Sequence, residues 1–480
     1  MGVSLETLAP EIILILAAAV VILGDAFAPR NLPRNTVLSI AGIGLLASAI
    51  SAVPLLSVQL LTFNGSIAVD SFAVYFKLLL IAATALVLLA STSFLDEGPR
   101  YRAEFVGLLL LATSALMFMA AAADLITAYI SIEMSSLSIA FLSAWRKRDL
   151  RSTEAGLKYF LLSALSSAIM LYGMAIVYGL TGQLQFAAIA RALGSTPSGA
   201  LLLGLTMLLA GFGFKISAVP FQMWTPDVYE GAPTLVTAFL SVASKSAGFA
   251  VAIRVLSTAL PSAQRDWALL VALLAIASMT VGNVIALVQS NMKRMLAYSS
   301  IAQAGYILVG VAAATPRGVS AVLFYLIAYT ATNLAAFIAL IEVARLTGSE
   351  RIADMRGLHQ RAPGLAFALA VSLFSLAGLP PFVGFFGKLY VFWAAAESGL
   401  LWLVLIAVVN SAISLYYYAQ VVHDIYLLPP PVAVAEVEQP ARPTPAIVSL
   451  ALAVAGVLVL GIVSGSFLAA QNVAAVALAR

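Results

Sequence analysis

Phe214-Lys-Ile-Ser-Ala-Val-Pro-Phe221 interrupts a long apolar run, residues 199–228, with a lysine and a proline. Proline lacks an amide hydrogen and breaks a regular helix, and a lysine at the centre of a bilayer costs about 2.5–3.5 kcal/mol on insertion scales. Backbone groups exposed at membrane depth persist only where protein or a water-filled cavity receives them. The stretch therefore predicts a broken transmembrane helix with an ion site at the break.

A second stretch of this kind lies further along the chain. Leu376-Ala-Gly-Leu-Pro-Pro-Phe-Val-Gly-Phe-Phe-Gly-Lys388 interrupts the apolar run 364–397. A lone proline would favour a packing kink, but two breaks in matching places favour an internal repeat. We interpret residues 124–257 and 294–426 as two copies of one unit. Because we assign each copy five spans, an odd number, we expect the copies to be inverted in the membrane.

The composition sets the fold class. The 480 residues are 62% hydrophobic and 10% charged, which excludes a soluble globular protein. Apolar runs cut at charged and Pro/Gly clusters predict an all-α polytopic membrane protein with about fourteen transmembrane helices. The chain has no cysteine, so disulfides, thiolate-held iron–sulfur clusters and zinc–cysteine sites are excluded.

These spans divide the chain into four parts. Residues 1–123 hold the first four helices, and residues 124–257 hold the first repeat with its broken helix. Residues 266–426 hold the second repeat, and residues 427–480 hold a Pro-rich linker and the last transmembrane helix.

The basic residues predict the orientation. Fifteen lysines and arginines lie in the loops after odd-numbered spans, and four lie on the opposite side. By the positive-inside rule we expect both termini on the outer side. The net charge of +4 therefore indicates membrane topology rather than a nucleic-acid partner.

Four ionisable residues are predicted at membrane depth: Glu133, Lys215, Lys245 and Lys388. The lysines are too far from a polar end to reach water, so we interpret them as functional. Lysine suits proton transfer because burial favours its neutral form and a nearby carboxylate favours its charged form. We expect Glu133 to pair with one of these lysines in a proton relay.

Two further lysines can be explained by a structural role as well as by a role in proton transport. Lys158 stands four residues after Glu154, so an ordinary ion pair on one helix is as good an explanation as a role in transport. Lys77 is interpreted as an interfacial anchor. Hydroxyl groups that could join a relay, or simply pack between helices, are those of Ser135, Ser136, Ser217, Ser244, Ser246, Tyr298, Ser299 and Ser300.

Six strings resemble the antiporter-like, proton-translocating subunits of respiratory complex I (NADH-quinone oxidoreductase). The resemblance extends over nearly the whole chain, and the strings that carry it are residues 124–133, 154–160, 214–221, 224–233, 291–301 and 376–388. The string Pro226-Asp-Val-Tyr-Glu-Gly-Ala-Pro233 resembles the subunit N branch rather than its longer sister subunits.

The resemblance implies a membrane-arm subunit that pumps protons, driven by quinone reduction at a distant site. It implies that the chain itself binds no cofactor or metal, that the complex uses NADH and quinone, and that the partners are other membrane-arm subunits and the lipid bilayer. The implied location is the bacterial inner (plasma) membrane. Glu133 and Lys215 match the family's coupled ion pair, Lys245 its central relay lysine and Lys388 its terminal lysine. Gln222 stands where such subunits usually carry histidine, which puts an obligatory histidine step in doubt.

Three alternatives remain open from the sequence. A multisubunit cation/proton antiporter subunit is the nearest, and the string at 226–233 disfavours it. A non-transporting scaffold would gain from leucine at the buried lysine positions. A solute permease lacks an evident substrate pocket.

Overall fold

The computed structural model describes residues 5–28, 31–97, 101–193, 199–430, 444–463, 465 and 471–473. Within these ranges, thirteen helices are long and apolar enough to cross a membrane. The broken helix at 363–397, whose halves are too short to be counted singly, supplies the fourteenth predicted span. The all-helical polytopic fold is confirmed, whereas most of the predicted Pro-rich linker lies outside the described residues.

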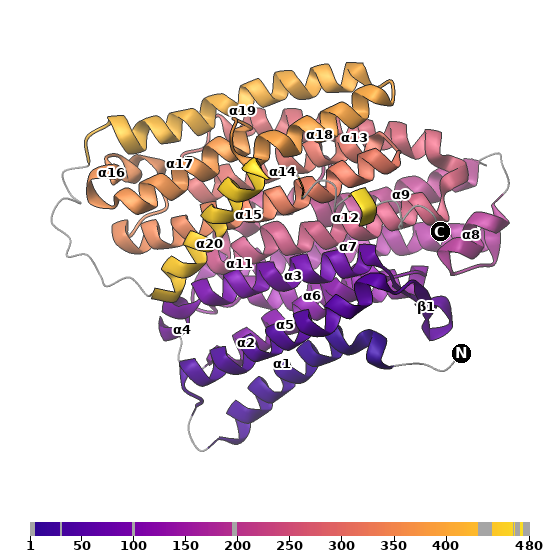
Figure 1. Cartoon of the computed structure of the whole chain (residues 1–480), viewed down its shortest axis with the longest axis horizontal. Coiled ribbons are helices and arrows are strands. Elements are labelled where there is room, and N and C mark those ends of the chain that lie inside the picture. Colours follow the sequence, from indigo (N-terminus) through magenta and orange to yellow (C-terminus); the bar gives the residue numbers. More distant parts are fainter. Residues whose placement is uncertain are drawn as a thin grey trace.

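The long helices lie side by side, from α1 at one edge to α19 at the other, and α20 crosses the face obliquely (Figure 1). Their bounds are α1 (Ala9–Phe27), α2 (Arg34–Ala52), α3 (Ser71–Ala90), α5 (Arg102–Ala121), α6 (Leu125–Ser143), α7 (Leu150–Thr181), α9 (Gly199–Ile216), α13 (Gln264–Ala286), α14 (Met292–Ala312), α15 (Pro316–Thr347), α19 (Leu401–Leu427) and α20 (Thr444–Ile462). Shorter elements are β1 (Leu60–Thr62), β2 (Ile67–Val69), α4 (Thr92–Glu97), α8 (Phe186–Ala192), α10 (Trp224–Gly231), α11 (Thr234–Phe239), α12 (Lys245–Arg254), α16 (Leu358–Arg361), α17 (Pro363–Ala377) and α18 (Val383–Glu397).

Both predicted helix breaks are present. The first separates α9 from α10 at residues 217–223, and the second separates α17 from α18 at residues 378–382. Gly378 adopts a φ of +87° at the second break, a conformation that glycine reaches without a side-chain clash. The prolines therefore interrupt the helices where the sequence predicted.

Matching local features support the proposed repeat. Asp124 and Asn291 cap the N-termini of α6 and α14 with their side chains. Each forms an isolated antiparallel bridge to a residue that follows the next helix, Asp124 to Gln185 and Asn291 to Arg351. Those next helices, α7 and α15, both contain 32 residues and end at a left-handed glycine.

We propose that the two units start from opposite sides of the membrane. Arg146 follows the C-terminal end of α6, and Asn291 precedes the N-terminal end of α14, yet both border one cavity. Residues 124–257 contain four candidate spans, and residues 266–426 contain five when the broken helix is counted as one. We propose that α5 belongs to the first unit, which then also has five spans and stays inverted relative to the second.

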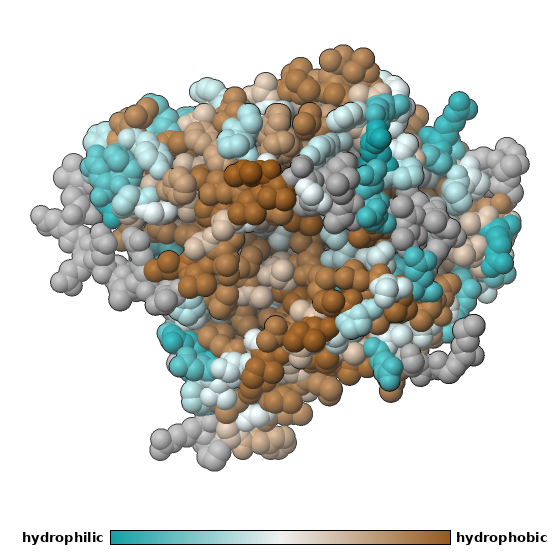
Figure 2. Space-filling model, in the orientation of Figure 1, coloured by the Kyte–Doolittle hydropathy of each residue, from teal (hydrophilic) through white to brown (hydrophobic). Residues whose placement is uncertain are grey.

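Hydrophobic residues cover most of the middle of the face drawn in Figure 2, and hydrophilic residues gather mainly toward the two ends of the long helices. Large exposed side chains such as Leu165 (60%) and Val409 (61%) lie on these helices. This distribution is the one expected when lipid surrounds the bundle.

Two buried ion pairs tie the first helices to the bundle. Arg254 of α12 donates to both carboxylate oxygens of Asp70, at 2.8 and 2.9 Å, and its guanidinium lies over the Phe72 ring. Lys77 lies 2.7 Å from a carboxylate oxygen of Glu11, and neither side chain is exposed. The interpretation of Lys77 as an interfacial anchor is therefore wrong, because its side chain is buried against Glu11 rather than placed at the membrane surface.

We predict that Asp70→Asn lowers the free energy of unfolding in detergent by about 3–5 kcal/mol, because it leaves the buried Arg254 charge uncompensated. Asparagine preserves the cap that Asp70 forms on the Ala73 amide. The matched control is Asp96→Asn, which removes the partly exposed pair with Arg34 and should cost under about 1 kcal/mol. Equal losses in the two variants would contradict the assignment.

Candidate functional site

The first break surrounds Lys215, the second-last residue of α9. The side chain is 1% exposed, and its ammonium donates to Ser135 at 2.9 Å, Ser136 at 3.1 Å and the Tyr159 hydroxyl at 3.4 Å. Gly248 of α12 permits this packing, since a Cβ there would lie 3.2 Å from Lys215 Cγ. Three neutral hydroxyl groups thus solvate Lys215 inside the bundle.

Glu133 does not form the expected ion pair. It lies half-buried on α6, and its Oε1 has no hydrogen-bond partner within the described ranges. Ser136 is one turn further along the same helix and accepts from Lys215. The hydroxyl groups therefore stand where a direct contact between Glu133 and Lys215 was predicted.

Lys245 begins α12, directly after a π-helical turn at Leu240–Ser244. It is 2% exposed, and its ammonium donates to the Ser300 carbonyl at 2.7 Å and to the Ser300 hydroxyl. The same hydroxyl accepts from Tyr329 at 2.9 Å and lies 3.3 Å from the hydroxyl of Tyr229. Single π-turns within helices are frequent at functional sites, because they shift a side chain out of the regular register.

Lys388 lies on α18, beyond the second break. Its ammonium donates to the Ala377 carbonyl at 2.8 Å and to Ser411 at 2.9 Å, and it lies 4.5 Å from the centre of the Tyr306 ring. A Cβ added at Gly378 would approach Lys388 Cδ to 2.9 Å, so glycine makes room for this side chain. The freed carbonyl at the end of α17 is thereby a ligand of the buried lysine.

Gln303 lies between Lys245 and Lys388. Its Nε2 donates to the Leu376 carbonyl at 2.9 Å, and its Oε1 accepts from Tyr325 at 2.5 Å. Tyr418 lies 3.5 Å from the same Nε2 and hydrogen-bonds to Ser299. Gln303 is not among the residues predicted from the sequence, although an amide inside an apolar helix is a usable signal.

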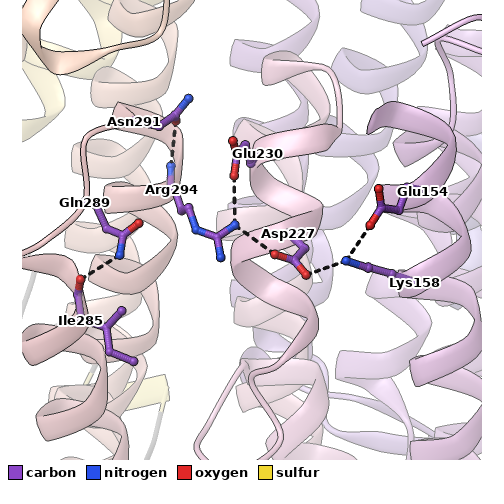
Figure 3. A network of polar contacts seen from close by, with 8 residues as sticks. All are labelled: Glu154, Lys158, Asp227, Glu230, Ile285, Gln289, Asn291 and Arg294. Carbon is purple, nitrogen blue, oxygen red and sulfur yellow. Dashed lines mark hydrogen bonds and ion pairs between the residues drawn. The ribbon is translucent and has the colours of Figure 1, made fainter. Parts of the chain in front are cut away.

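Lys158 belongs to a separate, partly exposed network of charges (Figure 3). Its ammonium lies 2.7 Å from Glu154 and 2.8 Å from Asp227, and Arg294 lies 2.9 Å from both Asp227 and Glu230. The network joins α7, α10 and α14. The ordinary pair with Glu154 is present, together with a second carboxylate that the sequence did not predict.

The remaining sequence candidates have varied surroundings. The hydroxyl oxygens of Ser217, Ser244 and Ser246 have no hydrogen-bond partner in the described part of the chain. The amide oxygen of the half-buried Gln222 has none there either. Tyr298 lies beneath the Arg294 guanidinium. Among the described residues, no group of three or more His, Cys, Asp or Glu side chains could hold a metal ion.

Helices broken at proline and lysines buried at membrane depth define the class, a polytopic membrane protein of the ion-coupled kind. The profile of the NADH:quinone oxidoreductase/Mrp antiporter family, transmembrane part, matches residues 122–414. The chain belongs to this family.

The family includes chains of NADH:quinone oxidoreductases and of Mrp antiporters, and this chain is similar to proteins of both kinds. The chain is 42% identical over 431 residues to NADH-quinone oxidoreductase subunit N of Trichlorobacter lovleyi, which covers 89% of this chain and 88% of that protein. A chain of respiratory complex I from Thermus thermophilus superposes with a TM-score of 0.80 and 34% identity, covering 95% of this chain and 97% of that one. A chain of the Mrp complex from Dietzia superposes with a TM-score of 0.80 at 24% identity, over 98% and 96% of the two chains, and shares the fold.

We predict that Gln303→Leu lowers the free energy of unfolding by about 1–3 kcal/mol for each buried partner left unpaired, the Leu376 carbonyl and the Tyr325 hydroxyl. Gln303→Glu keeps an acceptor for Tyr325 and serves as the conservative variant. Thermal unfolding of the purified protein in detergent measures both. If Gln303→Leu unfolded at the wild-type temperature, these hydrogen bonds would not stabilise the second break.

Proposed function

We propose that the chain is the subunit N of a bacterial NADH-quinone oxidoreductase and translocates protons in its membrane arm. The 42% identity over most of both chains and the 34% identity to a complex I chain support this assignment. NADH and quinone would be used by other subunits of the complex, and this chain would contact the neighbouring membrane-arm subunits. Its location would be the plasma membrane, with both termini outside.

One observation carries the proposal: the buried lysines are of two kinds. Lys77 and Lys293 each lie against a glutamate, Glu11 at 2.7 Å and Glu350 at 3.2 Å. Lys215, Lys245 and Lys388 instead contact hydroxyl and carbonyl oxygens, and none of the three forms an ion pair in the described part of the chain.

This difference matters for proton transfer. A lysine paired with a carboxylate must give up that attraction when it loses its proton. A lysine held by hydroxyl groups keeps its hydrogen bonds after the loss, because a hydroxyl can rotate and donate to the neutral amine. The three lysines held by neutral groups are therefore the relay, and the paired lysines are structural.

A proton step then needs only local rearrangement. Lys215 would exchange its proton with water near Glu133 and Gln222, whose oxygens Oε1 are buried and unpaired within the described residues. Lys245 would pass charge across Ser300 and Tyr329, and Lys388 would form the far end. Movement of a proton at one lysine changes the electrostatic free energy at the next, which couples the steps.

We predict that Lys215→Ala, at matched assembly, loses both proton pumping and coupled quinone reduction in membranes. Lys245→Ala should also lose pumping, whereas the exposed Lys147→Ala should behave as wild type. Quinone-reductase rate and the proton-to-electron ratio are the measurements.

Normal quinone reduction with normal pumping in Lys215→Ala would support a non-transporting scaffold instead. The shared fold with the Mrp chain makes a cation/proton antiporter the second candidate. Sodium-driven proton movement in vesicles without quinone turnover would favour it.

A further inference from the structure

A large cavity opens at the end of the bundle that carries the basic loops. Its volume is about 480 Å³, and it is bordered by the ends of α3 and α15, by α4, by the starts of α7 and α11 and by three interhelical loops. None of the three relay lysines borders it. The cavity is therefore distinct from these three residues, Lys215, Lys245 and Lys388, which we call the lysine line.

Four arginines border this cavity: Arg146, Arg151, Arg345 and Arg351. Among the described residues that border it, Glu350 is the one carboxylate. That carboxylate is already engaged, since its Oε1 accepts from Thr234 at 3.0 Å and lies 3.2 Å from Lys293. The wall therefore carries a clear excess of positive charge.

The arginines are held in place by different means. Arg345 pairs with Glu342 at 2.9 Å, and the Arg146 guanidinium lies 5.7 Å from the centre of the Phe94 ring. Arg351 is fixed through its backbone, which bridges to Asn291. Arg151 and Arg351 are exposed, and neither side chain forms an ion pair with any described residue. These two guanidinium groups retain their donors for a ligand.

The positive-inside rule explains why arginines lie on this side of the membrane. It does not require four of them to border one concavity. The inner wall is apolar, with Phe94, Leu235 and Ile341, so the cavity offers charge at its mouth and hydrocarbon contact below. Arginine forks match the oxygens of a phosphate group, and basic pockets between helices on the cytoplasmic side bind anionic headgroups.

We propose that this cavity binds a phosphate group, with Arg151 and Arg351 as its main ligands. The apolar inner wall favours the phosphate of an anionic phospholipid over a free phosphate ion. The site does not depend on the proton-translocating role, because it shares no residue with the lysine line.

The test uses the purified, delipidated complex that contains this chain. Its thermal unfolding is followed while dioctanoyl phosphatidylglycerol, dioctanoyl phosphatidylcholine or inorganic phosphate is added. Phosphatidylglycerol should raise the unfolding temperature of the wild type. The double variant R151Q/R351Q should need roughly 30-fold more of it, at about 1 kcal/mol for each arginine.

Arg148→Gln is the matched control, because Arg148 is exposed in the same loop as Arg146 but does not border the cavity. It should respond as the wild type does. A response to inorganic phosphate equal to that of the lipid, lost in R151Q/R351Q, would support the phosphate site with a soluble ligand.

The proposal is overturned if no phosphate compound stabilises the wild type, as expected were an acidic segment of a neighbouring subunit to fill the cavity. It is also overturned if R151Q/R351Q responds like the wild type. Quinone-reductase activity is measured alongside, and its loss in Lys215→Ala has no bearing on this result.

Discussion

At a helix break inside a bilayer, each freed carbonyl needs a donor from the protein, because lipid supplies none. Side chains supply donors at both breaks. At the first, the indole of Trp224 donates to the Phe214 carbonyl at 3.0 Å. At the second, Gln303 and Lys388 donate to the adjacent carbonyls of Leu376 and Ala377. The position of Lys388 depends on this requirement.

The two breaks meet this requirement differently, and the lysines beside them have different contacts. Lys215 precedes its break and contacts only side-chain hydroxyls, so the backbone of α9 does not need its charge. Lys388 follows its break and is a donor to the backbone itself. A change of protonation at Lys388 therefore alters the solvation of the end of α17, whereas a change at Lys215 alters the contacts between α6, α7 and α9. Of these two lysines, only Lys388 donates directly to a backbone carbonyl at the end of a broken helix.

The sequence predicted the spans, the two breaks and the buried lysines, because hydropathy, proline chemistry and the cost of burying charge are local properties of a segment. It did not predict which helices meet. Lys77 appeared interfacial from its position in its own span, yet α1 delivers Glu11 to it. Glu133 was expected to contact a lysine directly, but Ser135 and Ser136 accept the hydrogen bonds of Lys215 instead. Gln303 was overlooked because its importance lies in the carbonyl it meets, which belongs to a helix more than seventy residues away in sequence.

The cost of burying a charge explains the contacts of both the paired and the unpaired lysines. Glu11 with Lys77 and Asp70 with Arg254 combine charges that stay fixed, and breaking either pair leaves an uncompensated charge in the bundle. The first pair joins α1 to α3, and the second joins the start of α3 to α12. Hydroxyl and carbonyl ligands lower the cost of placing an ammonium group in the bundle, but they do not fix its charge state. The described part of the chain therefore combines buried ion pairs at α1 and α3 with three buried lysines that contact hydroxyl and carbonyl groups. Under the proposed function, these three are the lysines that gain and lose protons.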